Sequence, residues 1–95
     1  MQFEWDLSKQ RTNLAKHGID FTLAALVFGD PQLVLREDRT DDGGEQRWQA
    51  LGLACGLEPL LVVVHVYREA HYGEEIIRII SARKASTREG RAYFQ

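Results

Sequence analysis

The first third of the chain has the pattern of a short strand followed by two helices. Phe3–Trp5 is rich in aromatic residues, which is typical of a strand. Asp6 fits a helix N-cap, and the pattern after it predicts a helix from Leu7 to His17 that Gly18 ends. A second helix is predicted from Phe21 to Phe28, because apolar residues recur there at helical spacing. Since this helix is apolar on nearly all sides, we expect it to be deeply buried.

The remainder of the chain alternates between apolar strands and short turns. Strands are predicted over residues 32–36, 45–54, 60–68 and 75–82, and the third, as the most hydrophobic, is expected at the centre of the sheet. Short connections favour an antiparallel meander. Ser86-Thr87-Arg88-Glu89 has the form of a capping box that begins a final helix to Phe94. The order β-α-α-β-β-β-β-α predicts an α+β fold, with helices packed on a mainly antiparallel sheet.

Length and composition restrict the class of protein. A chain of 95 residues with 44% hydrophobic content predicts one globular domain over residues 1–95. The longest apolar run, around residues 60–66, is too short to cross a bilayer, and no signal peptide is visible. Cys55 is the single cysteine, so neither a disulfide framework nor a zinc set is expected. These features favour a cytoplasmic protein without a membrane partner.

Charge is unevenly distributed along the chain. The net charge is −2, yet residues 37–45 are mostly acidic and residues 78–91 are mostly basic. The basic stretch is explained either by chance clustering on a solvated surface or by a cationic face for a phosphate backbone or an acidic partner.

Several segments, in chain order and over nearly the whole length, resemble the BrnT family of ribonuclease toxins. They are Phe3-Glu4-Trp5-Asp6, Asn13-Leu14-Ala15-Lys16-His17-Gly18-Ile19, Phe21, Val27-Phe28-Gly29-Asp30-Pro31, Gly44-Glu45-Gln46-Arg47, Arg78-Ile79-Ile80-Ser81-Ala82-Arg83-Lys84-Ala85, Arg88-Glu89 and Tyr93. The resemblance implies a compact RelE-like fold and RNA cleavage with neither metal nor cofactor. It also implies a BrnA-like antitoxin partner, which carries the DNA-binding part of the complex.

Metal-free RNA cleavage uses the ribose 2′-hydroxyl as nucleophile, so the protein must move protons and stabilise charge on phosphorus. Histidine and carboxylate suit the proton transfers, and the planar fork of arginine suits the phosphate. The candidate catalytic residues are His17, Glu45, Arg47, Arg78 and Arg83. The candidate substrate-binding residues are Lys16, Lys84, Arg88 and Tyr93, and no metal ligands are expected.

Simpler explanations stand beside several of these roles. Lys16 and His17 are also what the C-terminus of a helix favours. Glu45 and Arg47 alternate on a predicted strand and could belong to a solvated face, with Trp48 pointing to the core. His65 lies within an apolar run, where a hydrogen-bonded core histidine is the commoner case.

Arg78 interrupts the apolar run 76–80, so its charge needs a water-filled groove or a partner such as Glu45. Arg83 is five residues further on, and an ideal strand would place the two arginines on opposite faces. They converge only if the chain bends after Ser81.

Three functions therefore compete at this stage. The first is a ribonuclease toxin that inhibits translation. The second is a non-catalytic binding module that pairs with an antitoxin or nucleic acid. The third, a general RNA-binding domain, is disfavoured because Phe3, Trp5, Phe28 and Trp48 are expected in the core and not on a stacking platform.

Overall fold

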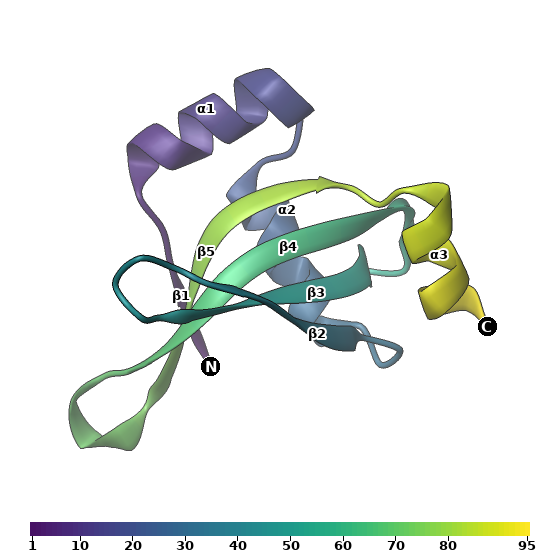
Figure 1. Ribbon diagram of the computed structural model, residues 1–95. Helices are drawn as coiled ribbons and strands as arrows, with labels where there is room; N and C mark the ends of the chain where they lie inside the picture. Colours follow the sequence, from purple (N-terminus) through teal and green to yellow (C-terminus); the bar gives the residue numbers. More distant parts are fainter.

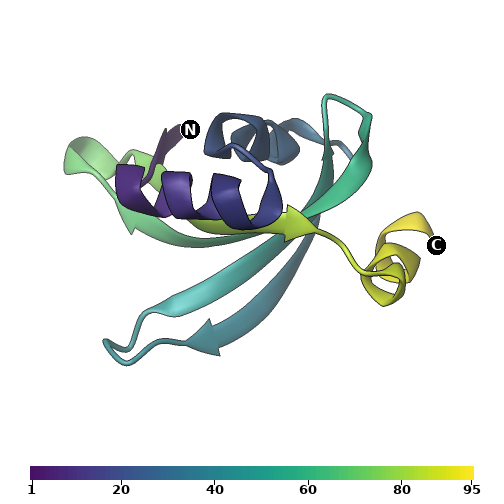
Figure 2. The ribbon, with the colours of Figure 1, turned by 90° about the horizontal axis from the view of Figure 1, so that it is seen from above.

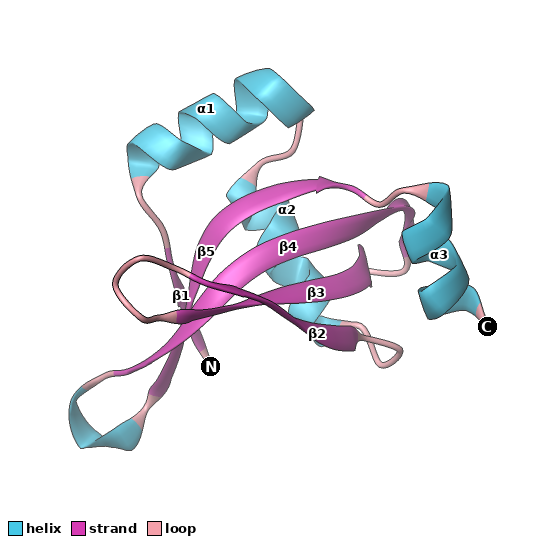
Figure 3. Cartoon of the chain, viewed as in Figure 1, coloured by secondary structure: helices cyan, strands magenta, loops and turns pink.

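The computed structural model describes all residues, 1–95, as a five-stranded sheet with three α-helices (Figures 1 and 3). Its elements are β1 (Gln2–Glu4), α1 (Leu7–His17), α2 (Phe21–Ala25), η1 (Leu26–Gly29), β2 (Val34–Thr40), β3 (Gln46–Ala54), β4 (Leu57–Glu69), η2 (His71–Gly73), β5 (Glu75–Lys84) and α3 (Thr87–Phe94). The sheet order is β1-β5-β4-β3-β2.

The sheet is mainly antiparallel, as predicted, and β4 lies at its centre. Strands β2 to β5 form the expected meander, while β1 pairs in parallel with β5 through Gln2–Ile76 to Glu4–Arg78. Figure 2 shows α1 and α2 on one side of the sheet, with the β2–β3 hairpin extending away from them. The mixed α+β architecture is therefore confirmed.

Helix α1 has the predicted bounds and the predicted caps. The Asp6 carboxylate accepts a hydrogen bond from the Lys9 amide, and Gly18 takes the left-handed conformation (φ 71°) that ends the helix. The helix runs beside β5 beyond the point where β1 stops (Figure 1). There Asn13 replaces a strand partner: its amide donates to the Ala82 carbonyl (2.9 Å) and its Oδ1 accepts from the Ala82 amide (3.0 Å). The backbone amide and carbonyl of Ala82, at the edge of β5, are thus hydrogen-bonded by a side chain of α1.

The second predicted helix differs from the expectation. It divides into the short α2 and the 3-10 segment η1, and it is not deeply buried, because Leu23 and Leu26 are exposed. Phe21, Ala24 and Val27 are fully buried and hold the segment on the sheet. The expectation of deep burial was therefore wrong, because only one stripe of the segment faces the sheet and no element covers Leu23 and Leu26 on the opposite side.

The apolar interior has two unequal parts. The main cluster lies between the sheet and the helices and includes Phe21, Val63, Ile77 and Ile79. A smaller group is buried on the other face of the sheet; it consists of Leu51, Leu60, Val62 and Val66. We call this second face, turned away from α2, the far face.

Candidate functional site

A bulge in β5 brings the two candidate arginines of that strand to one face. Val64 pairs with Ser81, but the next residue, His65, pairs with Ile79, so Ile80 is an extra residue in the strand. Arg78 consequently pairs with Val66 and Arg83 with Val62, both on the far face. The bend on which their convergence depends is therefore present, although it lies at Ile80, one residue before Ser81.

Arg78 lies on the far face in an ion pair with Glu4 of β1. The distance between Arg78 Nη1 and Glu4 Oε2 is 2.6 Å, and Arg68 Nη2 reaches the other oxygen of Glu4 at 2.8 Å. Glu45, the acid suggested by the sequence, is not the partner. Hydrogen bonds from Arg68 and Arg78 lower the pKa of Glu4 below its ordinary value, so this carboxylate stays ionised.

Arg83 is held by Glu89 at the start of α3. Its two terminal nitrogens donate to the two Glu89 oxygens at 2.7 and 2.9 Å, and Arg36 Nη2 donates to the same carboxylate at 3.2 Å. These contacts, with the Arg83 hydrogen bond as the largest cause, lower the pKa of Glu89 to about 2. Both arginine side chains remain 37% exposed, so each has room for a further ligand.

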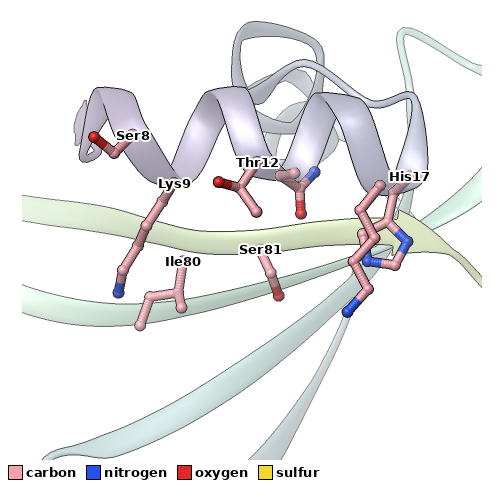
Figure 4. A pocket seen from close by; sticks show the side chains of 8 residues that line it. Ser8, Lys9, Thr12, His17, Ile80 and Ser81 are labelled. Atoms are coloured by element: carbon pink, nitrogen blue, oxygen red, sulfur yellow. The ribbon is translucent and has the colours of Figure 1, made fainter.

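A polar groove of about 350 Å³ lies between α1 and β5. It is lined by Ser8, Lys9, Thr12, Asn13, Lys16, His17, Ile80 and Ser81. Figure 4 shows Lys9 and His17 reaching from the two ends of the helix toward β5, with Ile80 and Ser81 between them. Ser81 shares its face with Arg83, two residues further along the strand, so the groove meets the far face at the edge of the sheet. Ile80 and Ser81, which lie between the two arginines in the chain, line the groove with Lys16 and His17, whereas Arg78 and Arg83 do not line it.

Glu45 and Arg47 lie at the β2–β3 hairpin. Strand β3 begins at Gln46, so Glu45 belongs to the turn and not to the predicted strand, and it is exposed. Arg47 Nε is buried without a hydrogen-bond partner, and the nearest carboxylate oxygen, of Asp41, is 3.9 Å away. Trp48 points to the helix side, as predicted, where it packs against Tyr67. The hairpin residues thus form a group separate from the α1–β5 groove.

Of the substrate-binding candidates at the C-terminus, Lys84 and Arg88 are exposed and Tyr93 is not free. Lys84 ends β5 and lines a hollow of about 480 Å³ under α3, together with Leu60 and Phe94. The Tyr93 hydroxyl donates to Asp30 Oδ2, and burial, followed by this contact, raises the pKa of Tyr93 to about 12. Tyr93 therefore fastens α3 to the segment after η1.

His65 is a core residue, which agrees with the simpler explanation for it. It is fully buried between the rings of Phe28 and Tyr67, and its Nδ1 lies 3.1 Å from the Val63 carbonyl oxygen. Burial lowers its pKa, and its Nε2 has no partner.

Sequence reasoning missed four residues of the arginine clusters: Glu4, Arg36, Arg68 and Glu89. The sequence offered Glu89 as half of a capping box and as part of the Arg88-Glu89 match to the BrnT family, but not as a partner of an arginine. The structure confirms the capping box, because Ser86 and Glu89 bond each other's backbone amides. The ion pairs of Glu4, Arg36 and Arg68 gave no sequence signal, since each joins residues more than fifty apart.

The protein presents no group of three or more His, Cys, Asp and Glu side chains suited to hold a metal ion. None of its helices combines the length and the apolar character that a membrane span requires. No curated protein matches the chain. A family model described as a ribonuclease toxin, BrnT, of type II toxin–antitoxin systems matches residues 5–89. The chain therefore belongs to the BrnT family of type II toxin–antitoxin ribonuclease toxins, a membership that implies an antitoxin partner.

Proposed function

We propose that this chain is a metal-independent endoribonuclease that cleaves RNA and thereby inhibits translation in the cytoplasm. Residues 1–95 act as a single domain with a RelE-like fold. The observation that carries the proposal is the β5 bulge, which sets Arg78 and Arg83 on one face of the strand, while Ile80 and Ser81 between them line the groove of Lys16 and His17. Guanidinium groups and a histidine supply what cleavage through a 2′-hydroxyl requires: charge stabilisation and proton transfer.

The carboxylates of the far face are poorly suited to proton transfer. A general base works best when its pKa is near the working pH. The Glu89 pKa of about 2 and the lowered pKa of Glu4 keep both groups ionised, so both are weak bases. His17 is partly exposed at the mouth of the groove, and it is our choice for proton transfer.

The remaining candidates hold the substrate. Lys16 lines the groove. Lys84 and Arg88 are exposed at the end of β5 and on α3, where they contact the phosphates of a single-stranded RNA. Tyr93 contributes by holding α3 in place through Asp30. Glu45 and Arg47 contact the same RNA from the β2–β3 hairpin.

We further propose that the antitoxin is BrnA-like and that it covers the surface formed by Lys16, Lys84 and Arg88. DNA contact would then come through the antitoxin, since the chain itself carries a net charge of −2.

Expression of the chain alone, and with its antitoxin, tests this function. We expect growth arrest and reduced bulk translation from the chain alone, and restored growth on co-expression. Purified protein should cleave single-stranded RNA in excess EDTA, and His17→Gln should lose cleavage while keeping antitoxin binding. A folded protein that binds the antitoxin but cleaves no RNA would instead be a non-catalytic binding module. Cleavage that stops with EDTA and returns with magnesium would overturn the metal-free mechanism.

A further inference from the structure

On the far face, arginines from two strands that are not neighbours in the sheet bind the same carboxylate. Arg83 is on β5 and Arg36 on β2, with β4 and β3 between them, so their backbones are about 14 Å apart at the usual strand spacing. Their side chains nevertheless meet at Glu89, which α3 holds above the sheet. Glu89 is only 14% exposed in its side chain, so this meeting point is substantially shielded from water.

The contacts leave donors unused on both arginines. A guanidinium has five N–H donors. Arg83 uses two on Glu89 and one on the Lys84 carbonyl, which leaves two of five. Arg36 uses one on Gln49 and one on Glu89, which leaves three of five. Two cations and one anion carry a net charge of +1, although the carboxylate of Asp38 also acts on Arg83.

We propose that Arg36 and Arg83 form a clamp for a phosphodiester group of RNA, and that Glu89 is the positioning residue that holds the clamp together. Donors fixed in advance stabilise developing charge better than mobile ones, because they need no reorganisation during the reaction. Neither Arg36 nor Glu89 was a candidate from the sequence. The identity of the ligand as RNA rests on the proposed function.

The capping box supplies a variant that isolates the charge of Glu89. Glutamine also closes a capping box, so Glu89→Gln keeps the start of α3 while it weakens the grip on both arginines. Ser86→Ala does the opposite, because it removes the cap and leaves the ion pairs. Asp38→Asn removes one negative charge near Arg83 without breaking a hydrogen bond to either arginine, so it controls for charge alone.

Cleavage kinetics of these variants test the clamp. We expect Glu89→Gln to lower kcat by about 10- to 100-fold, less than the loss from deleting a charge-stabilising donor outright. KM should stay within about twofold, because two effects on RNA binding oppose each other. Loss of the negative charge of Glu89 favours RNA binding, whereas the reduced order of the two arginines weakens it. Ser86→Ala and Asp38→Asn should keep kcat within about twofold. An unchanged kcat in Glu89→Gln, or an equal loss in either control, would overturn the proposal.

A binding readout separates the clamp from the nuclease activity. The Nε–H NMR signals of Arg36 and Arg83 are followed while a 2′-O-methyl oligoribonucleotide, which cannot be cleaved, is added to the wild-type protein. Both signals shifting along one titration curve supports the clamp, even if the wild type cleaves no RNA and the proposed function fails. A shift of Arg83 without Arg36 would show that Arg36 is not part of the site.

Discussion

Four arginines on the far face form two pairs, and each pair shares one carboxylate. Arg68 and Arg78 share Glu4, and Arg36 and Arg83 share Glu89. Ion pairs with this much exposure contribute little to stability, since water and salt screen them. Their effect is orientation: each guanidinium is held in one place and keeps donors for a ligand. Substitutions here should therefore separate activity from stability.

Arg78→Ala is the sharpest test of this separation. We predict that it lowers RNA cleavage by about 30- to 1000-fold, as expected when about 2–4 kcal/mol of transition-state stabilisation is lost. The unfolding free energy should fall by less than about 1 kcal/mol, because Glu4 keeps Arg68 as a partner. Arg68→Ala loses an ion pair with the same carboxylate and is the matched control for stability. Unchanged cleavage in Arg78→Ala would remove this residue from the site.

The sequence indicated that Arg78 needs a partner, but it identified neither that partner nor the role of Arg36. A charge inside the apolar run 76–80 indicated that Arg78 needs a partner. The partner's identity depends on the parallel pairing of β1 with β5, which joins residues 74 apart, and no local pattern encodes that register. Arg36 gave no signal at all, because its role depends on where α3 sets Glu89.

At the scale of elements, the position of α1 depends on one buried side chain. Asn13 makes three hydrogen bonds: it donates to the carbonyls of Ile19 and Ala82, and it accepts from the Ala82 amide. This helix carries the Lys16–His17 side of the groove. Asn13 belongs to the segment that resembles the BrnT family, and the structure gives it a structural role, next to the proposed catalytic histidine.

We predict that Asn13→Ala destabilises the protein by about 2–4 kcal/mol, because it leaves three buried backbone groups without a partner. Asn13→Asp should lose at least as much, since it keeps an acceptor for the Ala82 amide but turns a buried carboxylate oxygen toward the carbonyls of Ile19 and Ala82. Urea unfolding measures both, with Thr12→Ala, exposed on the same helix, as a control within about 0.5 kcal/mol of wild type. A loss below 1 kcal/mol in Asn13→Ala would show that α1 is held by other contacts.

Helix α3 is attached differently, by polar contacts at its two ends. It has no fully buried residue, and it is joined to the sheet by Glu89 and, through Tyr93, to Asp30. Asp30 also accepts from the Leu53 and Gln32 amides. It lies close to Gly52, where an added Cβ would lie 3.2 Å from Asp30 Oδ2 and 2.7 Å from Val27. The capping box predicted the start of this helix, and Arg83 is only six residues from Glu89, but Arg36 and Asp30 lie more than fifty residues from their partners in α3 and could not be foreseen.

Elements without buried apolar contacts open at low free-energy cost. We therefore predict that amides of residues 87–94 exchange with solvent much faster than those of β4 in the free protein. Tyr93→Phe should speed this exchange further and leave β4 unchanged, whereas Arg88→Ala, on the exposed side, should change neither. Hydrogen exchange followed by NMR measures this directly. Protection of α3 equal to that of β4 would place the helix in the core.

At the scale of the whole molecule, hydrophobic patterning predicted the layers better than the contacts across them. The meander, the central place of β4 and the helix-covered face follow from periodicity and short turns. The bulge at Ile80 does not, because an extra residue in an apolar run leaves the pattern of apolar residues nearly intact. That single residue decides whether Arg78 and Arg83 act together, so the site depends on a detail to which periodicity is insensitive.

The stability of the whole fold should depend on pH through His65. This residue is fully buried, its Nε2 has no partner, and burial lowers its pKa from an ordinary value of 6.5. Below pH 6.5 the unfolded chain therefore takes up a proton that the folded protein resists. The stabilising contribution is complete above 6.5 and is lost as the pH falls toward the lowered pKa.

We predict that the unfolding free energy of the wild type decreases between pH 7.5 and 5.5, by up to about 1.4 kcal/mol per pH unit below 6.5. Urea unfolding at several pH values measures the slope. His65→Gln should lose this slope whatever its absolute stability, because glutamine does not titrate. His71→Gln, which changes an exposed histidine, should keep the slope of the wild type. A wild-type stability that stays flat over this range, or a slope that persists in His65→Gln, would show that the buried imidazole is not the group that couples folding to pH.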